Sequence, residues 1–576
     1  MQPSGAAEVS AVRAKSNHLL AMSFLFSMVV NALMLSGPIY MLQVYDRVLG
    51  SRSEETLIAL SVLLTFLFLM MGIMDYVRGR LMARVGARFQ STLDGRVFAA
   101  HLRQAAQTPG GAGSRTPLRD LEAVQRLLSS PVFLAVLDVP WTPLFIAAVF
   151  ILHPALGLLA TGGGAVLVAL AIVNQMSTRG PMARAGQATA QAELTSQQLA
   201  SEAELVQSLG MRGAAFARWM KARGASLAQA VSFSDKSGFF TVTTKTLRLF
   251  LQSAMLGLGA YLVLQNEMTA GAMIAGSILM GRALAPIELM IGQWQVVDAA
   301  RKGRQSVIRL LDQVPPEAVR TPLPRPQALL VAENVTVVPP GSTQAALRAV
   351  SFVLKPGQAM GVIGPSGAGK TSLAKAVTGA WAPAGGKLRL DSATLDQYDA
   401  DVLGSYIGYL PQTVTLFDGT IADNIARLQE DPDPALIVEA AKKAAAHEMI
   451  LQQPEGYDTP VSAVGGRLSG GQIQRIGLAR AMYGDPILLI LDEPNSNLDN
   501  EGTIALNRAI KGMKEAGKSI IIIAHRPAAI QECDVLLMIR DGMRQAFGPR
   551  EEVLQSMVKN HETIAGTPPD RPGGVT

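Results

Sequence analysis

A glycine-rich loop and an acidic strand end are the residues best suited to chemistry. Residues Gly364–Thr371 read Gly-Pro-Ser-Gly-Ala-Gly-Lys-Thr, which matches the phosphate-binding loop pattern. Far downstream, the apolar run Ile487–Leu491 ends in Asp492 and Glu493. Main-chain N–H groups of such a loop cradle phosphates, and carboxylates at a strand end can bind a metal ion and polarise water. Together the two segments predict hydrolysis of a nucleoside triphosphate.

Each residue type in these segments has a specific predicted role. Lys370 should reach the β- and γ-phosphates, while the hydroxyl of Thr371 and the carboxylate of Asp492 should bind Mg²⁺. Glu493 should polarise the attacking water. The predicted nucleotide-binding residues around the loop are Gly364, Pro365, Ser366, Gly367, Ala368, Gly369, Lys370, Thr371 and Ser372.

A parallel sheet with flanking helices is required to position these groups. Met360–Ile363 predicts a strand before the loop, and Ser372–Val377 predicts a helix after it. The helix N-terminus then faces the phosphates, where its dipole favours negative charge. Ile487–Leu491 is apolar throughout, which is typical of a parallel strand buried on both faces.

Two more polar residues follow predicted strands. Gln412 comes after Ile407–Pro411 and is a candidate partner for Mg²⁺ and water. His525 comes after the apolar segment Ser519–Ala524, where a sensor of the γ-phosphate is needed. Neither residue is specific alone, but their order along the chain supports a catalytic role with Glu493.

The N-terminal half of the chain predicts a membrane domain. The chain of 576 residues is 49% hydrophobic and only 17% charged, and the charge deficit lies in its first 300 residues. Six segments are long enough to cross about 30 Å of hydrocarbon: 19–44, 57–77, 132–152, 154–174, 247–266 and 271–291. His153 and Pro154 predict a tight hairpin between the third and fourth spans. The prolines after Asp138 predict a kink in the third.

Basic residues orient these spans. Arginines and lysines crowd the stretches between spans two and three and between spans four and five, whereas the opposite loops hold only Arg47 and Arg52. The positive-inside rule then places both termini, and with them the ATPase domain, in the cytoplasm. Membrane orientation thus accounts for the net charge of +6, and no nucleic-acid partner is expected. Asp138 and Arg282, inside spans, should face the helix bundle or a cavity.

Leu468–Gln472, with the sequence Leu-Ser-Gly-Gly-Gln, makes residues 329–560 resemble an ATP-binding-cassette (ABC) nucleotide-binding domain. In that family this signature segment caps the ATP held by a second cassette, so the resemblance implies a homodimer. It implies nucleotide contacts from Ser469, Gly470, Gly471 and Gln472. It also makes Gln412 the Q-loop residue, Asp499 the D-loop aspartate, Glu493 the catalytic glutamate and His525 the switch histidine.

The membrane half resembles a narrower family. Gly37–Leu49, Asp138–Phe145 and Arg282–Glu288 are similar to segments of the type I secretion permease/ATPases, which export proteases, lipases, RTX and S-layer proteins. The resemblance implies a homodimer in the bacterial inner membrane, with a periplasmic adaptor (membrane fusion) protein and an outer-membrane channel. It implies export of unfolded polypeptides that carry a C-terminal secretion signal, driven by ATP with Mg²⁺.

The expected fold class is a membrane all-α six-helix transmembrane domain of ABC exporter type, fused to an α/β P-loop ABC nucleotide-binding domain. The expected parts are an N-terminal cytoplasmic tail at 1–18, a transmembrane domain with long cytoplasmic helix extensions at 19–315, a linker at 316–328, the nucleotide-binding domain at 329–562 and a disordered tail at 563–576.

Two alternatives remain open from the sequence. A lipid or drug exporter would have the same six spans and cassette, and an ABC regulator or ATP-gated channel would not pump at all. One departure from the ABC pattern concerns the base: no aromatic residue near Val338–Pro340 is available to stack on adenine. The single cysteine, Cys533, excludes a disulfide within the chain.

Overall fold

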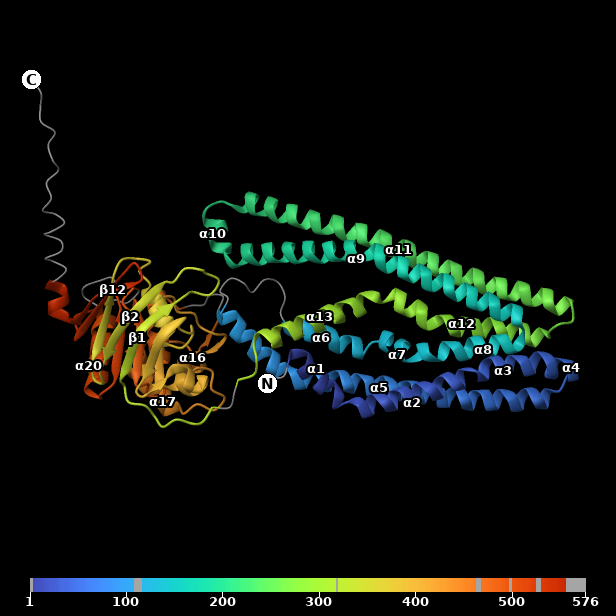
Figure 1. The fold of residues 1–576 in the computed structure, drawn as a ribbon, viewed down its shortest axis with the longest axis horizontal. Helices are drawn as coiled ribbons and strands as arrows, with labels where there is room; N and C mark the ends of the chain where they lie inside the picture. The colour runs from blue at the N-terminus through green and yellow to red at the C-terminus, as the bar shows by residue number, and fades with distance from the viewer. Residues whose placement is uncertain are drawn as a thin grey trace, which may run out of the picture. The chain divides into compact units, whose positions relative to one another are not determined.

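The computed structural model describes residues 4–107, 117–317, 320–462, 468–496, 500–524 and 530–555. The chain divides near Pro316 into two compact units. We call the part before this point the helical unit and the part after it the α/β unit. Figure 1 shows long helices in the first unit and strands with short helices in the second.

The helical unit is built from helices alone over its described residues. Their bounds are α1 Gly5–Ala14, α2 Asn17–Met34, α3 Ser36–Gln43, the π-helix η1 Val44–Val48, α4 Leu49–Ser51, α5 Glu54–Gln107, α6 Pro117–Leu128, α7 Pro131–Asp138, the 3₁₀ turn η2 Val139–Trp141, α8 Thr142–Leu152, α9 Pro154–Ser201, α10 Ala203–Ser208, α11 Arg212–Leu264, α12 Ala270–Gly292 and α13 Trp294–Gln313.

Six helical stretches in the described part of the chain are long and apolar enough to cross a membrane, which confirms the six predicted spans. Helices α5, α9 and α11 contain 54, 48 and 53 residues. Because a crossing needs roughly 20 residues, these three helices extend well beyond the hydrocarbon layer. Helices α9 and α11 run side by side along this extension and are joined by α10 (Figure 1).

The proline-containing segment of the third span interrupts its helix, as predicted. Helix α7 ends at Asp138, the turn η2 follows, and α8 resumes at Thr142. Pro140 and Pro143 have no N–H to donate to the preceding turn, so the regular α-helical hydrogen bonding is lost there. At the predicted hairpin, the ring of His153 accepts a hydrogen bond from the N–H of Ala155 (3.2 Å) and caps α9.

Asp138 belongs to a buried polar cluster between the first three spans. Its Oδ1 accepts a hydrogen bond from Arg78 Nη1 at 2.7 Å and another from Asn31 Nδ2 at 2.8 Å, and Ser27 donates to it as well. Arg78 is 5% exposed. Asp138 therefore faces the bundle and is neutralised there, as expected of a charge in a span. Arg282, in contrast, is exposed on the surface of the single chain, so it does not face the interior of the bundle.

The first described residues form a helix. Gly5–Ala14 form α1, whose Val9 is buried against α5, α6 and α13. Glu8 pairs with Arg96 at 3.2 Å, and the N–H of Gly5 donates to Asp312 at 2.6 Å. The tail expected at residues 1–18 therefore contains a helix that packs on the helical unit, because one face of this short polar segment carries valines.

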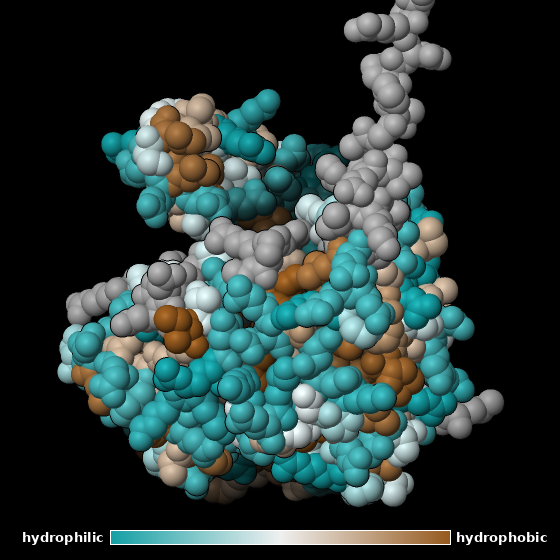
Figure 2. Space-filling model, turned by 90° about the vertical axis from the view of Figure 1, so that its left-hand side faces the viewer, coloured by the Kyte–Doolittle hydropathy of each residue, from teal (hydrophilic) through white to brown (hydrophobic). Residues whose placement is uncertain are grey.

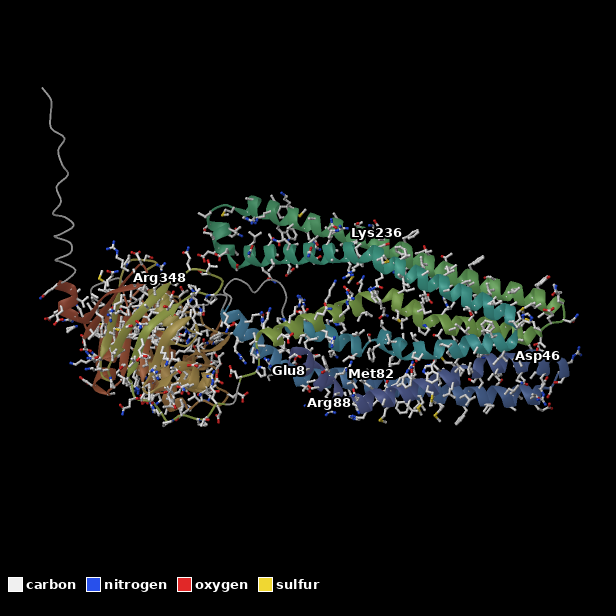
Figure 3. The ribbon with its side chains drawn as sticks, viewed as in Figure 1. Glu8, Asp46, Met82, Arg88, Lys236 and Arg348 are labelled. Atoms are coloured by element: carbon white, nitrogen blue, oxygen red, sulfur yellow. The ribbon has the colours of Figure 1, made fainter. Side chains whose placement is uncertain are left out.

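Asp46 joins the first and sixth spans near the end of the helical unit that lies farthest from Glu8 (Figure 3). Its carboxylate accepts hydrogen bonds from the hydroxyl of Thr269 at 2.6 Å and from the N–H of Gly271 at 3.0 Å. Both donors lie at the start of α12, where helical N–H groups have no partner in the helix. Asp46 thus caps α12 from η1, within the segment Gly37–Leu49.

The α/β unit has two principal sheets over its described residues. Its strands are β1 Leu330–Val337, β2 Leu347–Leu354, β3 Ala359–Ile363, β4 Gly385–Leu390, β5 Ala393–Thr394, β6 Ile407–Leu410, β7 Gly419–Thr420, β8 Pro460–Val461, β9 Leu488–Asp492, β10 Ser519–Ile523, β11 Val535–Arg540 and β12 Met543–Pro549. Its helices are α14 Lys370–Val377, η3 Leu395–Gln397, α15 Ala400–Tyr406, α16 Ile421–Ile425, α17 Pro434–Lys443, α18 His447–Leu451, η4 Gly456–Asp458, α19 Gly470–Met482 and α20 Asn500–Glu515.

The larger sheet positions the candidate site. Its order is β12-β11-β3-β10-β9-β6, and β3, β10, β9 and β6 are parallel to their neighbours. Ile523 is in register with Val362 on β3 and with Asp492 on β9, so the carboxyl ends of these strands meet at one edge. An antiparallel sheet of order β2-β1-β4-β5 accompanies it.

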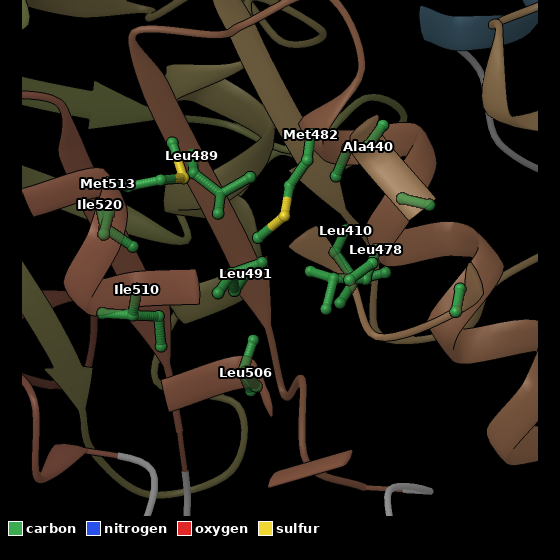
Figure 4. Packing of buried hydrophobic residues seen from close by; sticks show 14 of the residues in the cluster. Leu410, Ala440, Leu478, Met482, Leu489, Leu491, Leu506, Ile510, Met513 and Ile520 are labelled. Carbon is green, nitrogen blue, oxygen red and sulfur yellow. The ribbon is translucent and has the colours of Figure 1, made fainter. Parts of the chain in front are cut away.

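Apolar side chains cover both faces of the larger sheet. Leu489 and Leu491 of β9 face one cluster, with Met482 and Leu478 from α19 (Figure 4). Alternate residues of the same strand, such as Leu488, face the other cluster. The surface turned to the viewer in Figure 2 is mostly hydrophilic, with scattered hydrophobic residues.

Candidate nucleotide-binding site

The loop Gly364–Thr371 leaves β3 and opens α14, as predicted. Its backbone requires glycine: Gly369 has φ +99°, and a Cβ there would lie 2.4 Å from the carbonyl oxygen of Ala346. A Cβ on Gly364 would lie 2.0 Å from the oxygen of Ile539. Only glycine fits these close approaches, so the sequence dictates the loop's shape.

Lys370 is the first residue of α14 and is 5% exposed. Its ammonium donates hydrogen bonds to the carbonyl oxygens of Gly364 (2.9 Å) and Pro365 (2.8 Å), across the mouth of the loop. Burial lowers the pKa of Lys370, while the carboxylates of Glu493 and Asp492 raise it in part. The negative charges of Glu493 and Asp492 therefore act directly on the ammonium group of Lys370. Thr371 and Ser372 follow in the first turn of α14, both half-buried.

The acidic pair lies at the carboxyl end of β9, two strands away from β3 in the sheet. Asp492 is 1% exposed. Burial of the neighbouring Tyr409, together with the charge of Asp492, raises the pKa of Tyr409 to about 12. Glu493 adopts φ +52°, a left-handed conformation that is unusual for a residue with a side chain. Its N–H donates to the carbonyl oxygen of Ile523 at 2.9 Å, so β10 fixes the point where the chain turns.

Gln412 lies on the same edge of the sheet. Leu410, the last residue of β6, is in register with Leu491, so Gln412 follows two residues beyond the strand next to Asp492. Its side chain is exposed. His525 and Asp499 lie outside the described residues. The structure therefore brings together the loop, Asp492, Glu493 and Gln412.

The signature segment Leu468–Gln472 belongs to a different part of the α/β unit. Ser469 caps α19 in a reciprocal arrangement: its N–H donates to Gln472 Oε1 at 2.8 Å, and its Oγ accepts from the N–H of Gln472 at 3.3 Å. Ser469 and Gly470 are exposed. Helix α19 packs against α16 and α17, whereas α14 packs against β1 and β9. The signature thus presents an exposed helix N-terminus suited to a phosphate.

Gln474 is a site residue that the sequence reasoning missed. It lies in α19, is 3% exposed, and its amide nitrogen donates to the carbonyl oxygen of Pro494. Weaker contacts of 3.5 Å reach the oxygen of Glu493 and the hydroxyl of Ser496. Helical spacing could have indicated that Gln474 is buried, because it lies on the same face of α19 as Leu478 and Ala481, both of which are buried.

Comparison with known proteins agrees with this geometry. Residues 20–285 match the ABC transporter transmembrane region, and residues 347–496 match the ABC transporter family. The chain is 42% identical over 533 residues to the type I secretion system ATP-binding protein PrsD of Rhizobium meliloti, covering 92% of both chains. It is 27% identical to the cyclolysin secretion/processing ATP-binding protein CyaB of Bordetella pertussis, covering 94% of this chain and 76% of that one.

The fold also has a solved counterpart. A bacterial Atm1-family ABC exporter with ATP bound superposes with a TM-score of 0.78 at 20% identity, covering 96% of this chain and 99% of that chain. Six apolar helical stretches in the described residues and an ABC ATPase unit make the chain a multi-pass inner-membrane protein that binds and hydrolyses ATP. The chain belongs to the type I secretion family of ABC transporters.

Proposed function

We propose that the chain is the ATP-driven pump of a type I secretion system. It exports unfolded polypeptides that carry a C-terminal secretion signal across the bacterial inner membrane. The observation that carries this proposal is the similarity to a type I secretion ATP-binding protein along 92% of the chain, membrane half included. A periplasmic adaptor and an outer-membrane channel are the expected partners.

ATP and Mg²⁺ suit the residues of the site. Gly364 and Gly369 let the loop pack directly against main-chain oxygens of Ile539 and Ala346, and Lys370 donates to two main-chain oxygens of the loop itself. The hydroxyl of Thr371 and the buried carboxylate of Asp492 are oxygen donors of the kind that Mg²⁺ prefers. We assign Lys370 to the phosphates and these two oxygen groups to the metal, with Gln412 beside them.

The positions of these residues indicate the role of each one in ATP hydrolysis. Bound Mg²⁺ would offset negative charge on the phosphates. Glu493 leaves the strand beside Asp492, where its carboxylate can orient and polarise a water molecule. Lys370 stabilises charge that develops on the phosphoryl oxygens. His525 and Asp499 keep the roles that the ABC resemblance implies, as γ-phosphate sensor and D-loop residue.

Two copies of the chain are needed to complete each site. The exposed N-terminus of α19, with Ser469, Gly470, Gly471 and Gln472, would contact ATP held by the loop of a second copy. Closure of the two ATPase units over ATP and reopening after hydrolysis would move the long extensions of α5, α9 and α11. Differential affinity of ATP for the closed dimer supplies the driving force.

The proposed orientation has both termini and the α/β unit in the cytoplasm. Arg80, Arg84 and Arg88 are exposed on α5 just beyond its apolar section, where the positive-inside rule expects cytoplasm. The same end of the helix continues toward Gln107 and beyond the bilayer. Cysteine labelling of intact cells at position 88 tests this: label should enter only after the inner membrane is permeabilised.

ATPase activity in proteoliposomes distinguishes polypeptide export from lipid or drug export. We expect activity to change when the C-terminal segment of a type I substrate from the same bacterium is added. A version lacking the final signal should have no effect, and small amphiphiles should not replace it. Stimulation by amphiphiles alone, together with failure to co-purify with a periplasmic adaptor, would favour a lipid or drug exporter.

A further inference from the structure

Arg282 lies near the middle of α12, the sixth membrane span. It comes 12 residues after Ala270 and 10 residues before Gly292, the two ends of the helix. At 1.5 Å per residue these separations are about 18 Å and about 15 Å along the helix axis, farther than an arginine side chain can extend. The guanidinium therefore reaches neither the lipid headgroups nor the water at the ends of the span. Because a charge in hydrocarbon is costly, this side chain must face something polar.

The structure leaves one narrow strip of α12 open around Arg282. Ala283 and Leu284 are 1% and 2% exposed, whereas Arg282 and Ala285 are exposed. A Cβ added to Gly281 would meet no atom within 4 Å. On its other sides α12 packs against α3, α7, α8, α9 and α11, and Figure 1 shows it between α8 and α11. We call the open strip formed by Gly281, Arg282 and Ala285 the Arg282 face.

The spans hold no free carboxylate at this depth to neutralise Arg282. The six predicted spans contain three carboxylates: Asp75, Asp138 and Glu288. The first two pair with Arg78 at 2.6 and 2.7 Å, and the third pairs with Arg248 at 3.0 Å. Asp75, which shares its arginine, lies two residues before the end of the second predicted span and so not at mid-span. Arg282 itself has no ion pair among the residues that the structure describes.

Depth and charge together narrow the choice of what Arg282 faces. A lipid acyl chain has no charge, and lipid phosphates lie at the surface of the bilayer. A second copy of the chain brings the same three carboxylates, none of them free at mid-span. A hydrated path through the membrane remains, and in an exporter that path carries the polypeptide. Of the groups on a polypeptide, a carboxylate binds a guanidinium best, through two parallel N–H···O bonds.

We propose that the Arg282 face lines the path of the exported polypeptide and that Arg282 binds carboxylates of its aspartate and glutamate side chains. The proposal rests on the proposed export function and adds a chemical preference to it. Two copies of the chain would place two unpaired positive charges along the path. Such a path attracts acidic segments of an unfolded chain and repels basic ones.

Photo-crosslinking from the Arg282 face tests this directly. Benzoylphenylalanine replaces Ala285 in the full chain, which is placed in nanodiscs of zwitterionic phosphatidylcholine. The probes are two acetylated, amidated peptides of equal length, one of Gly-Ser-Glu repeats and one of Gly-Ser-Gln repeats, and the products are mapped by mass spectrometry. We expect crosslinks from position 285 to both peptides. The half-saturating concentration should be about tenfold lower for the glutamate peptide, the effect of one charge-assisted contact.

Two variants show whether Arg282 causes this preference. Arg282→Gln should make the two peptides equivalent by weakening the glutamate peptide. Arg84→Gln is the matched control, because Arg84 is also exposed but lies on α5 beyond its apolar section. It should leave the preference unchanged. If the change at Ala285 prevents folding, Arg282→Gln alone is compared with the unmodified chain, as export into inside-out vesicles of two substrates that differ only in glutamate or glutamine.

Equal half-saturation of the two peptides when Arg282 is intact would overturn the proposal, as would a preference that survives Arg282→Gln. Photoproducts at position 285 that join two copies of the chain, or the chain to a lipid, in place of any peptide product would also overturn it. The ATPase response to the C-terminal polypeptide is measured in the same nanodiscs. A normal response without the glutamate preference rejects the Arg282 contact alone, whereas a missing response counts against the export function itself.

Discussion

Replacing Gln474 by methionine removes an amide donor from the turn that follows β9 while keeping the length of the side chain. Gln474 connects α19, which starts at the signature segment, with the turn that contains Glu493 and Pro494. Its bond to the oxygen of Pro494 is the short one, while the 3.5 Å contacts are at the limit of hydrogen bonding and contribute little. The change therefore removes the buried hydrogen bond to Pro494.

The size of the effect follows from the burial of this contact. Leaving a buried acceptor without its donor costs about 1–3 kcal/mol. Glu493 also holds a left-handed backbone, which costs roughly 1–2 kcal/mol and needs support from its surroundings. If the turn relaxes, the carboxylate of Glu493 moves away from the attacking water. A loss of about 1.4–2.7 kcal/mol in the transition state is a tenfold to hundredfold fall in kcat.

Steady-state ATPase assays of the full chain separate this role from a general packing defect. KM for ATP should stay within about twofold, because Gln474 bonds to the turn after β9, whereas Lys370 bonds to Gly364 and Pro365 of its own loop. Gln453→Met is the matched control: Gln453 also donates to a main-chain oxygen, that of Met449 at 3.3 Å, but lies just after α18. A Gln474→Met chain whose kcat stays within twofold of the unmodified chain would refute this reasoning.

Three further changes have expected outcomes. Glu493→Gln should retain ATP binding, hydrolyse ATP far more slowly and accumulate closed dimers on native gels; near-normal turnover would remove Glu493 from the catalytic role. Arg78→Met should destabilise the chain in detergent by about 3–5 kcal/mol, because Asp138 keeps a buried charge without its partner, and adding Asp138→Leu should restore most of the loss in thermal unfolding. Cys533 is buried, which raises the pKa of its thiol from 9.0 to about 12, so iodoacetamide at pH 8 should alkylate it only after unfolding. Because the folded chain keeps a proton that the unfolded chain loses, stability should fall as pH rises from about 9 to 12, and Cys533→Ala should lack that component of the decline.

Local patterns explain what the sequence could predict. The six spans followed from apolar runs of the required length, and the break after Asp138 followed from two prolines. The loop Gly364–Thr371 was predictable because its backbone geometry admits glycine at specific positions. Each of these features depends on a few consecutive residues, so one sequence is enough to see it.

Long-range partners could not be predicted in the same way. Arg78 neutralises Asp138 from 60 residues away, and Asp46 caps a helix that starts more than 220 residues later. Each contact depends on how separate helices pack, which no local pattern encodes. Gln474 was overlooked although its helical phase pointed inward, because its partner lies beyond the next strand. The N-terminal helix α1 was missed because its apolar face consists of only two valines, Val9 and Val12.

Transport of a polypeptide by the purified chain tests the central claim most directly. Inside-out vesicles containing the chain are supplied with a labelled polypeptide that has its C-terminal signal, and protected label is measured after protease treatment. Protection should require ATP with Mg²⁺ and the intact signal, and it should fail with Glu493→Gln. Protection that is independent of ATP, or equal for a polypeptide without its signal, would contradict the account.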